Sequence, residues 1–295
     1  MNTSLGYDGP EMIADYNCEV GEGVLWHSDE KRVYWTDIPT GRMFRLDPSS
    51  GKHAQFYNGE IIGGFTIQAD GSLLLFIEKG GIKSYRHGEL QTLIPKIPGE
   101  ELSRFNDVIA DPKGRVFCGT MPTEDRPGRL YRLDPDGQIN LLLEELDIPN
   151  GLGFTPDENG LYFTETGEGK IHLFDYDQST GKISGKRTFV YLKDEQGGPD
   201  GMTVDSEGCI WSALWDGGCI VRYTPEGKET ARIELPAKKV TSLTFGGEDY
   251  SDLYVTTAGG NNKAQEGEGA GALFRINFTS LEGSEEYRSR IHISS

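Results

Sequence analysis

Short apolar runs recur along the whole chain at nearly constant spacing. Six of them can be aligned with one another: GVLW, GFTIQ, DVIAD, GLGFT, GMTVD and SLTF. Each run directly follows one residue of a set that shares the same repeat position: Glu22, Gly63, Asn106, Asn150, Asp200 and Thr241. Consecutive members of this set are 41, 43, 44, 50 and 41 residues apart. A period of this length is typical of propellers and solenoids.

Each repeat continues with the same succession of turns and strand-like runs. A turn rich in Gly or Asp is followed by a second run such as VYWTD or LYFTET, and a third run such as GRLYRL opens with Gly. A fourth run, such as RTFVYL, completes five of the six repeats. The apolar spacing is close to two, which excludes a helical repeat, and no amphipathic helix separates the strands as a (β/α)₈ barrel requires. The pattern predicts an all-β fold, a six-bladed β-propeller of four-stranded antiparallel blades.

The sixth repeat lacks a fourth run directly after GALFRI, so another segment must complete the ring. The segment EMIADY, residues 11–16, precedes the first repeat and has strand character. We predict that it forms the outer strand of the last blade, and we rank SRIHI, residues 289–293, second for this place. Closure matters because an open ring would leave apolar faces and sheet edges in water.

Composition is consistent with one soluble domain over residues 1–295. No run approaches the roughly 20 apolar residues that a membrane helix needs, and the N-terminus lacks the basic and apolar regions of a secretion signal, so we expect a cytoplasmic protein with four reduced cysteines. The net charge of −18 comes from 47 acidic and 29 basic residues. Such a surface repels nucleic acid and anionic membranes, and neither is expected as a partner. Nothing in the sequence marks an oligomeric state.

The aligned repeat position carries the candidate chemistry. In a propeller, residues that begin the innermost strands meet at one mouth of the central channel, so four oxygen-bearing side chains should converge there: Glu22, Asn106, Asn150 and Asp200. An all-oxygen set favours Ca²⁺, with Mg²⁺ or Mn²⁺ as alternatives. Asn-Gly and Asp-Gly pairs are also strong hairpin signals, so Asn150-Gly151 and Asp200-Gly201 could instead be plain turns. Turn chemistry does not explain why Glu22 and Asn106 share the register.

Other site chemistries have little support. The chain has no GxSxG elbow, HExxH helix, phosphate-binding loop or EF-hand loop. The five histidines, among them His172, fall at different repeat positions, and we interpret each as a surface or packing residue.

Four segments resemble signature blocks of the SMP-30/gluconolactonase/LRE family: GEGVLW, RFNDVIADPKGRVFCGTM, IPNGLGF and GPDGMTVDSEGCIW. The resemblance implies a six-bladed propeller with one divalent cation and lactonase activity on sugar lactones. It implies three metal ligands, Glu22, Asn150 and Asp200. It also implies three substrate contacts, Arg104, Asn106 and Glu124. The family's GESP-type block reads Gly21-Glu22-Gly23-Val24 in this chain, which leaves the ligand intact but changes the neighbouring wall.

We therefore expect a gluconolactonase-like hydrolase whose cation polarises the lactone carbonyl, with Asp200 as general base. Ca²⁺ is the first choice, and Zn²⁺, Mn²⁺ or Mg²⁺ remain open. One alternative is a phosphotriesterase or aryl esterase that uses the same site. Another is a propeller that only binds partners, because Tyr34–Asp37 spells the YWTD motif of receptor propellers.

Overall fold

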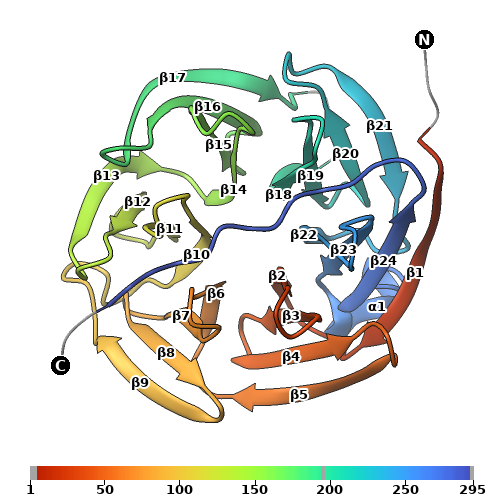
Figure 1. Cartoon of the computed structure of the whole chain (residues 1–295), viewed down its shortest axis with the longest axis horizontal. Helices are drawn as coiled ribbons and strands as arrows, with labels where there is room; N and C mark the ends of the chain where they lie inside the picture. The colour runs from red at the N-terminus through yellow and green to blue at the C-terminus, as the bar shows by residue number, and fades with distance from the viewer. Residues whose placement is uncertain (1–4, 194–196, 293–295) are drawn as a thin grey trace.

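The chain folds into a ring of blades around a central channel (Figure 1). The computed structural model describes residues 5–193 and 197–292. These residues form six four-stranded sheets in which every neighbouring pair of strands is antiparallel. The predicted six-bladed β-propeller is confirmed.

Five blades are built from four consecutive strands, which follow one another from the channel outward. The first contains β2 (Gly21–His27), β3 (Arg32–Asp37), β4 (Arg42–Asp47) and β5 (Lys52–Asn58). The second contains β6 (Ile62–Ile67), β7 (Leu73–Ile77), β8 (Ile82–Arg86) and β9 (Glu89–Ile94). The third contains β10 (Phe105–Ala110), β11 (Val116–Thr120), β12 (Gly128–Leu133) and β13 (Ile139–Leu146). The fourth contains β14 (Pro149–Phe154), β15 (Gly160–Glu165), β16 (Lys170–Asp177) and β17 (Lys182–Tyr191). The fifth contains β18 (Gly198–Val204), β19 (Ile210–Trp215), β20 (Cys219–Tyr223) and β21 (Glu229–Glu234).

The sixth blade joins the two ends of the chain. Its strands are β22 (Val240–Gly246), β23 (Asp252–Thr257), β24 (Ala272–Phe278) and β1 (Tyr7–Asp15). Strand β1 pairs with β24 from Tyr7↔Phe278 to Asp15↔Ala272, so the prediction that the EMIADY segment closes the ring is confirmed. Between β23 and β24 lie the short helices η1 (Gly260–Asn262) and α1 (Lys263–Glu266).

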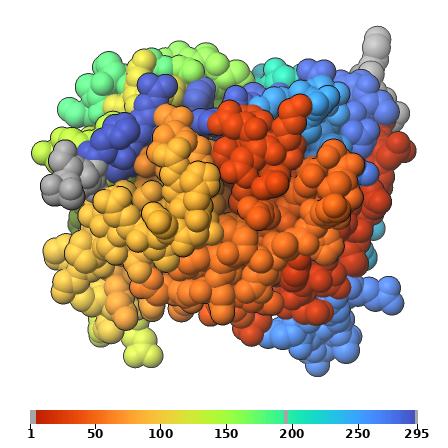
Figure 2. All heavy atoms as spheres, turned by 60° about the horizontal axis from the view of Figure 1, so that its bottom comes forward, coloured from red at the N-terminus to blue at the C-terminus, as the bar shows by residue number. Residues whose placement is uncertain are grey.

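The segment after β24, residues 279–292, crosses one mouth of the channel (Figure 1). We call it the strap. It bridges Asp205 at the end of β18 through Gly283 and Gln68 at the end of β6 through Ser289. The alternative role for SRIHI, as the closing strand, is wrong for its described residues. Glu22 and its counterparts lie near the starts of the innermost strands, whereas the strap meets the ends of these strands and covers the opposite mouth of the channel. We call the mouth beside Glu22 the near mouth and the mouth beneath the strap the far mouth. In Figure 2 the strap, in dark blue, lies on the upper face, whereas the lighter blue segment around α1 projects from the lower face.

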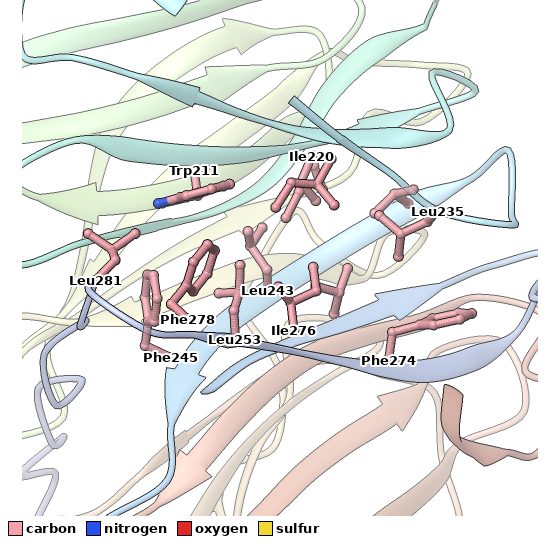
Figure 3. Packing of buried hydrophobic residues seen from close by; sticks show 14 of the residues in the cluster. Trp211, Ile220, Leu235, Leu243, Phe245, Leu253, Phe274, Ile276, Phe278 and Leu281 are labelled. Carbon is pink, nitrogen blue, oxygen red and sulfur yellow. The ribbon is translucent and has the colours of Figure 1, made fainter. Parts of the chain in front are cut away.

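Apolar packing between neighbouring blades holds the ring together. In Figure 3, Trp211 and Ile220 of the fifth blade face Phe278 and Leu243 of the sixth, and Leu281 of the strap packs at the end of the same cluster. Burial of a large apolar side chain stabilises a fold by roughly 1.5–3 kcal/mol. Since each blade buries its faces only against its neighbours, these interfaces depend on one another.

Every innermost strand has a register shift at the aligned repeat position. The shifts lie between Glu22 and Leu25, Ile62 and Gly64, Phe105 and Val108, Asn150 and Leu152, Pro199 and Met202, and Val240 and Leu243. Such bulges re-aim side chains and are common next to active sites. The Asn150-Gly151 and Asp200-Gly201 pairs therefore lie inside strands, and their interpretation as hairpin turns is wrong. A Cβ on Gly151 would lie 2.4 Å from the Asp200 carbonyl oxygen, so this close approach of two blades requires glycine.

All four cysteines are free and buried. No helix among the described residues is long and apolar enough to span a membrane.

Candidate active site

Two buried carboxylates come together at the near mouth. Glu22 is 8% exposed and Asp200 is 3% exposed. The only polar contact described for the Glu22 carboxylate is with the Gly23 N–H, which donates to Oε2 at 2.9 Å. Burial, together with the nearby Asp107, raises the pKa of Glu22 to about 8. Burial and the charges of Glu22 and Asp107 also raise the pKa of Asp200 well above its ordinary range.

The Asn150 side chain presents an oxygen that has no partner. Its Nδ2 donates to Asp200 Oδ1 and, at 3.1 Å, to Thr166 Oγ1. Thr166 Oγ1 in turn donates to the Pro199 carbonyl at 2.8 Å, which fixes it as the acceptor for Asn150. Asn150 Oδ1 is buried and makes no hydrogen bond. A buried polar atom without a partner is rare in folded proteins and points to a missing ligand.

Arg104 and Asn106 are held together beside the two carboxylates. Arg104 Nη1 donates to Asn106 Oδ1 and to the Phe105 carbonyl, each at 2.8 Å. Asn106 Nδ2 donates to the Pro149 carbonyl at 3.0 Å. Burial lowers the pKa of Arg104, although Glu22 and Asp200 oppose the shift. The oxygen of Asn106 is thus already engaged, whereas that of Asn150 is free.

The near mouth and the channel behind it carry more negative charge than Arg104 can balance. Asp107 follows Asn106 at the bulge of β10, and burial raises its pKa to about 6. At the strap, burial raises the pKa of Glu286 to about 7, with a further contribution from Asp107. Like charges buried close together favour either protonation or a bound cation.

A divalent cation fits the residues that are present. Two carboxylates and one unpartnered amide oxygen form an all-oxygen donor set, which suits Ca²⁺ and other hard cations. The cation would also supply positive charge to Glu22 and Asp200 beyond that of Arg104. Glu22, Asn150 and Asp200 are the side chains that would hold it.

The sixth predicted site residue, Glu124, lies apart from these contacts. It is exposed in the turn between β11 and β12 and lines a surface hollow with Asp147 and Glu168. Neither Arg104 nor Asn106 forms part of that hollow. The role of Glu124 as a substrate contact stays a prediction.

The raised pKa values predict how stability depends on pH. A group with a raised pKa binds protons more readily in the folded state, so its contribution to stability is present below its unfolded value and is lost as the pH rises through its folded value. For Glu22 this window runs from about 4.5 to about 8. We expect the free energy of unfolding of the cation-free protein to fall across it, by up to about 1.4 kcal/mol per pH unit for each such group.

Urea unfolding at pH 5 and pH 8, with chelator or with excess Ca²⁺, measures this effect. Ca²⁺ should stabilise the protein more at pH 8, where the carboxylates are free to bind it. If Ca²⁺ stabilised the protein equally at both pH values, the raised pKa values assigned to the site carboxylates would be contradicted.

The fold and site define a class: a six-bladed propeller with a carboxylate and amide cluster at one end of its channel. The SMP-30/Gluconolactonase/LRE-like family model matches residues 20–259. A pentonolactonase of Haloferax volcanii is 46% identical over 288 residues, which cover 95% of this chain and 98% of the relative. A 6-deoxy-6-sulfogluconolactonase of Pseudomonas putida is 33% identical, with 84% and 86% of the two chains covered. The crystal structure of regucalcin from Agrobacterium tumefaciens, described as a calcium-binding protein, superimposes with a TM-score of 0.88 at 25% identity, with 96% and 98% covered.

This chain belongs to the SMP-30/gluconolactonase/LRE family. The family resemblance expected from the four sequence blocks is confirmed, and so is the expectation of an enzyme of the lactonase class. The alternative of a propeller that only binds partners is not supported. Its YWTD motif lies within the buried strand β3, where Asp37 contacts Arg42.

Sequence reasoning missed two residues of the site. Asp107 was overlooked because strand alternation places it on the opposite face from Asn106, and only the bulge turns it toward the channel. Thr166 lies 16 residues after Asn150, and no pattern in the sequence indicates that its hydroxyl orients the amide.

Proposed function

We propose that this protein hydrolyses sugar lactones at the near mouth, with one divalent cation held by Glu22, Asn150 and Asp200. The unpartnered Oδ1 of Asn150, whose Nδ2 bonds the buried Asp200 carboxylate, is the observation that carries the proposal. Ca²⁺ is the first candidate because all three donors are oxygen atoms. The similarity to a calcium-binding regucalcin supports this choice.

The pentonolactonase relative makes five-carbon aldonolactones the first candidates for the substrate. Since the strap covers the far mouth, we infer that the substrate enters from the near mouth. The four free, buried cysteines support a reducing compartment, and we propose the cytoplasm as the location.

Ring opening requires a water oxygen to attack the lactone carbonyl carbon. When bound, the cation supplies Lewis-acid polarisation of that carbonyl. Asp200 accepts the proton from the attacking water, and the bond between the carbonyl carbon and the ring oxygen breaks. The ring oxygen leaves as a hydroxyl group after it takes up a proton, and the product is a hydroxy acid. Arg104, fixed against Asn106, orients the sugar hydroxyls through guanidinium N–H groups.

Initial rates on a substrate panel test this function. The panel contains a pentonolactone, gluconolactone, a phosphotriester and an aryl ester, with acid release followed by a pH indicator. We expect the highest kcat/KM on the pentonolactone. Hydrolysis of the phosphotriester or the aryl ester without any turnover of lactones would overturn the proposal.

Replacing Asn150 with Ala should weaken cation binding by at least about tenfold, since it removes one oxygen of the set. Calorimetric titration with Ca²⁺, after a chelator has removed bound metal from the protein, measures the affinity for the cation. Asn140→Ala is a matched control, because the Asn140 amide bonds Asp134 near the turn that follows β12. Equal affinity in the two variants would count against Asn150 as a ligand.

A further inference from the structure

A second group of metal-ligating side chains lies on the fourth blade. Glu165 ends β15, His172 lies in β16, and Glu168 is in the turn between the two strands. One ligand atom from each of these residues lies within 4.8 Å of the other two. The pairs Phe163↔His172 and Glu165↔Lys170 place the side chains of Glu165 and His172 on the same face of the sheet.

The His172 imidazole is buried and has no hydrogen bond. It is 4% exposed, and neither ring nitrogen has a partner. Its Nε2 is 3.2 Å from Glu165 Oε2 and 3.8 Å from Glu168 Oε2. The ring therefore points at both carboxylates without a hydrogen bond to either. The ring has lost its hydration, and the two close carboxylates are its described polar neighbours, so an additional partner could supply the hydrogen bonds or coordination that its nitrogens lack.

Two lysine ammonium groups pair with the carboxylates of this group, and a metal ion could displace both of them. Lys186 Nζ is 2.5 Å from Glu165 Oε2, and the Lys186 side chain is 40% exposed. Lys170 Nζ is 2.9 Å from Glu168 Oε2 and is also partly exposed. Both lysines can swing into solvent if a divalent cation takes their place.

We propose that Glu165, Glu168 and His172 form a second cation site, separate from the near-mouth set and specific for a Zn²⁺-like transition metal ion. One imidazole and two carboxylates suit Zn²⁺, Co²⁺ or Mn²⁺, whereas Ca²⁺ prefers oxygen donors alone. The two sites of this protein thus differ in the cation that they select. Because Glu165 precedes Thr166, whose hydroxyl accepts a hydrogen bond from Asn150, a cation bound to Glu165 would also fix the strand end that supports the near-mouth site.

The competing interpretation is an ion-pair network in which a protonated His172 lies between the two carboxylates and no metal binds. The two interpretations predict different effects on metal binding when the charge of Lys186 is removed. If the group binds a metal, removal of the Lys186 charge strengthens binding, because the cation no longer competes with an ammonium group. If the group is only an ion-pair network, the same change brings no metal into the protein.

Equilibrium dialysis of the chelated full chain against Zn²⁺, in excess Ca²⁺ that fills the near-mouth set, tests the proposal. We expect about one Zn²⁺ per chain by elemental analysis. His172→Gln and Glu168→Gln should each weaken Zn²⁺ binding by at least about tenfold. Lys186→Met should strengthen it. His53→Gln is the matched control, because the exposed His53 ring bonds the Tyr16 hydroxyl at 2.8 Å and should not affect Zn²⁺.

Glu168→Gln keeps the test decisive if His172→Gln does not fold, because Glu168 is in a turn and its side chain is 41% exposed. Co²⁺ in place of Zn²⁺ provides a second measurement, the visible absorption of an ion bound to imidazole, which His172→Gln should abolish. Zn²⁺ binding that is unchanged in both variants would overturn the proposal. Absence of bound Zn²⁺ from both the unmodified chain and Lys186→Met would overturn it as well.

Discussion

Replacing Asp200 with Asn should lower kcat for lactone hydrolysis by about 10³-fold or more. General bases typically contribute 10²–10⁴-fold, and this change also removes one charge from the cation site. Asn has the same shape and can still accept the hydrogen bond from Asn150 Nδ2, so the fold should persist. Steady-state kinetics on a pentonolactone, at a cation concentration that saturates the variant, measure the effect.

Bound cation must be quantified in the same samples, because loss of a ligand and loss of a base both lower the rate. Glu286→Gln is the matched control, since Glu286 also has a pKa raised by burial but reaches the channel from the strap. We expect this control to keep most of the activity. If Asp200→Asn retained normal kcat at equal cation occupancy, the role of Asp200 as base would be wrong.

Deletion of β1 should have the largest effect on stability. A chain that begins at Tyr16 leaves the edge of β24 unpaired and exposes the apolar surface that Ala14 and Ile13 cover. We expect the free energy of unfolding to fall by several kcal/mol, which corresponds to a drop in Tm of roughly 10 °C or more. The exposed edge should also promote aggregation, since an unpaired strand is a template for further pairing.

Thermal unfolding and light scattering of this shortened chain measure both effects. A chain that begins at Leu5 keeps all of β1 and serves as the control. Equal Tm values for the two chains would show that β1 does not close the ring in solution.

Local patterns in the sequence were sufficient to predict the ring. Each blade repeats its own strand lengths, turn residues and apolar alternation, so an overlay of six repeats recovers both the blade count and the shared register of Glu22, Asn150 and Asp200. The closing strand could be predicted because the last repeat lacked one strand and EMIADY had the character to supply it.

Features that depend on contacts between distant segments could not be predicted. The path of the strap across the channel could not be predicted, because its residues bind backbone atoms at the ends of β6 and β18, far away in sequence. The interpretation of His172 as a surface or packing residue agrees with its burial, but it gave no sign that the ring lies beside two carboxylates. Its approach to Glu165 and Glu168 depends on the turn between β15 and β16, which has no motif of metal-ligand spacing. The bulges that turn Asp107 toward the channel likewise need the register of two paired strands.

The way in which the strap leaves β24 has a practical consequence for protein engineering. Thr279 N–H donates to the Gly6 carbonyl at 3.0 Å where the strap begins, and His292 N–H donates to the Pro135 carbonyl at 2.8 Å near its end. The strap crosses the far mouth, so both ends of the described chain leave the ring on that side. An affinity tag, a fused protein or a solid support attached to either end would therefore face away from Glu22 and Asp200. Immobilised on a surface through either terminus, the protein would present its near mouth to the solution.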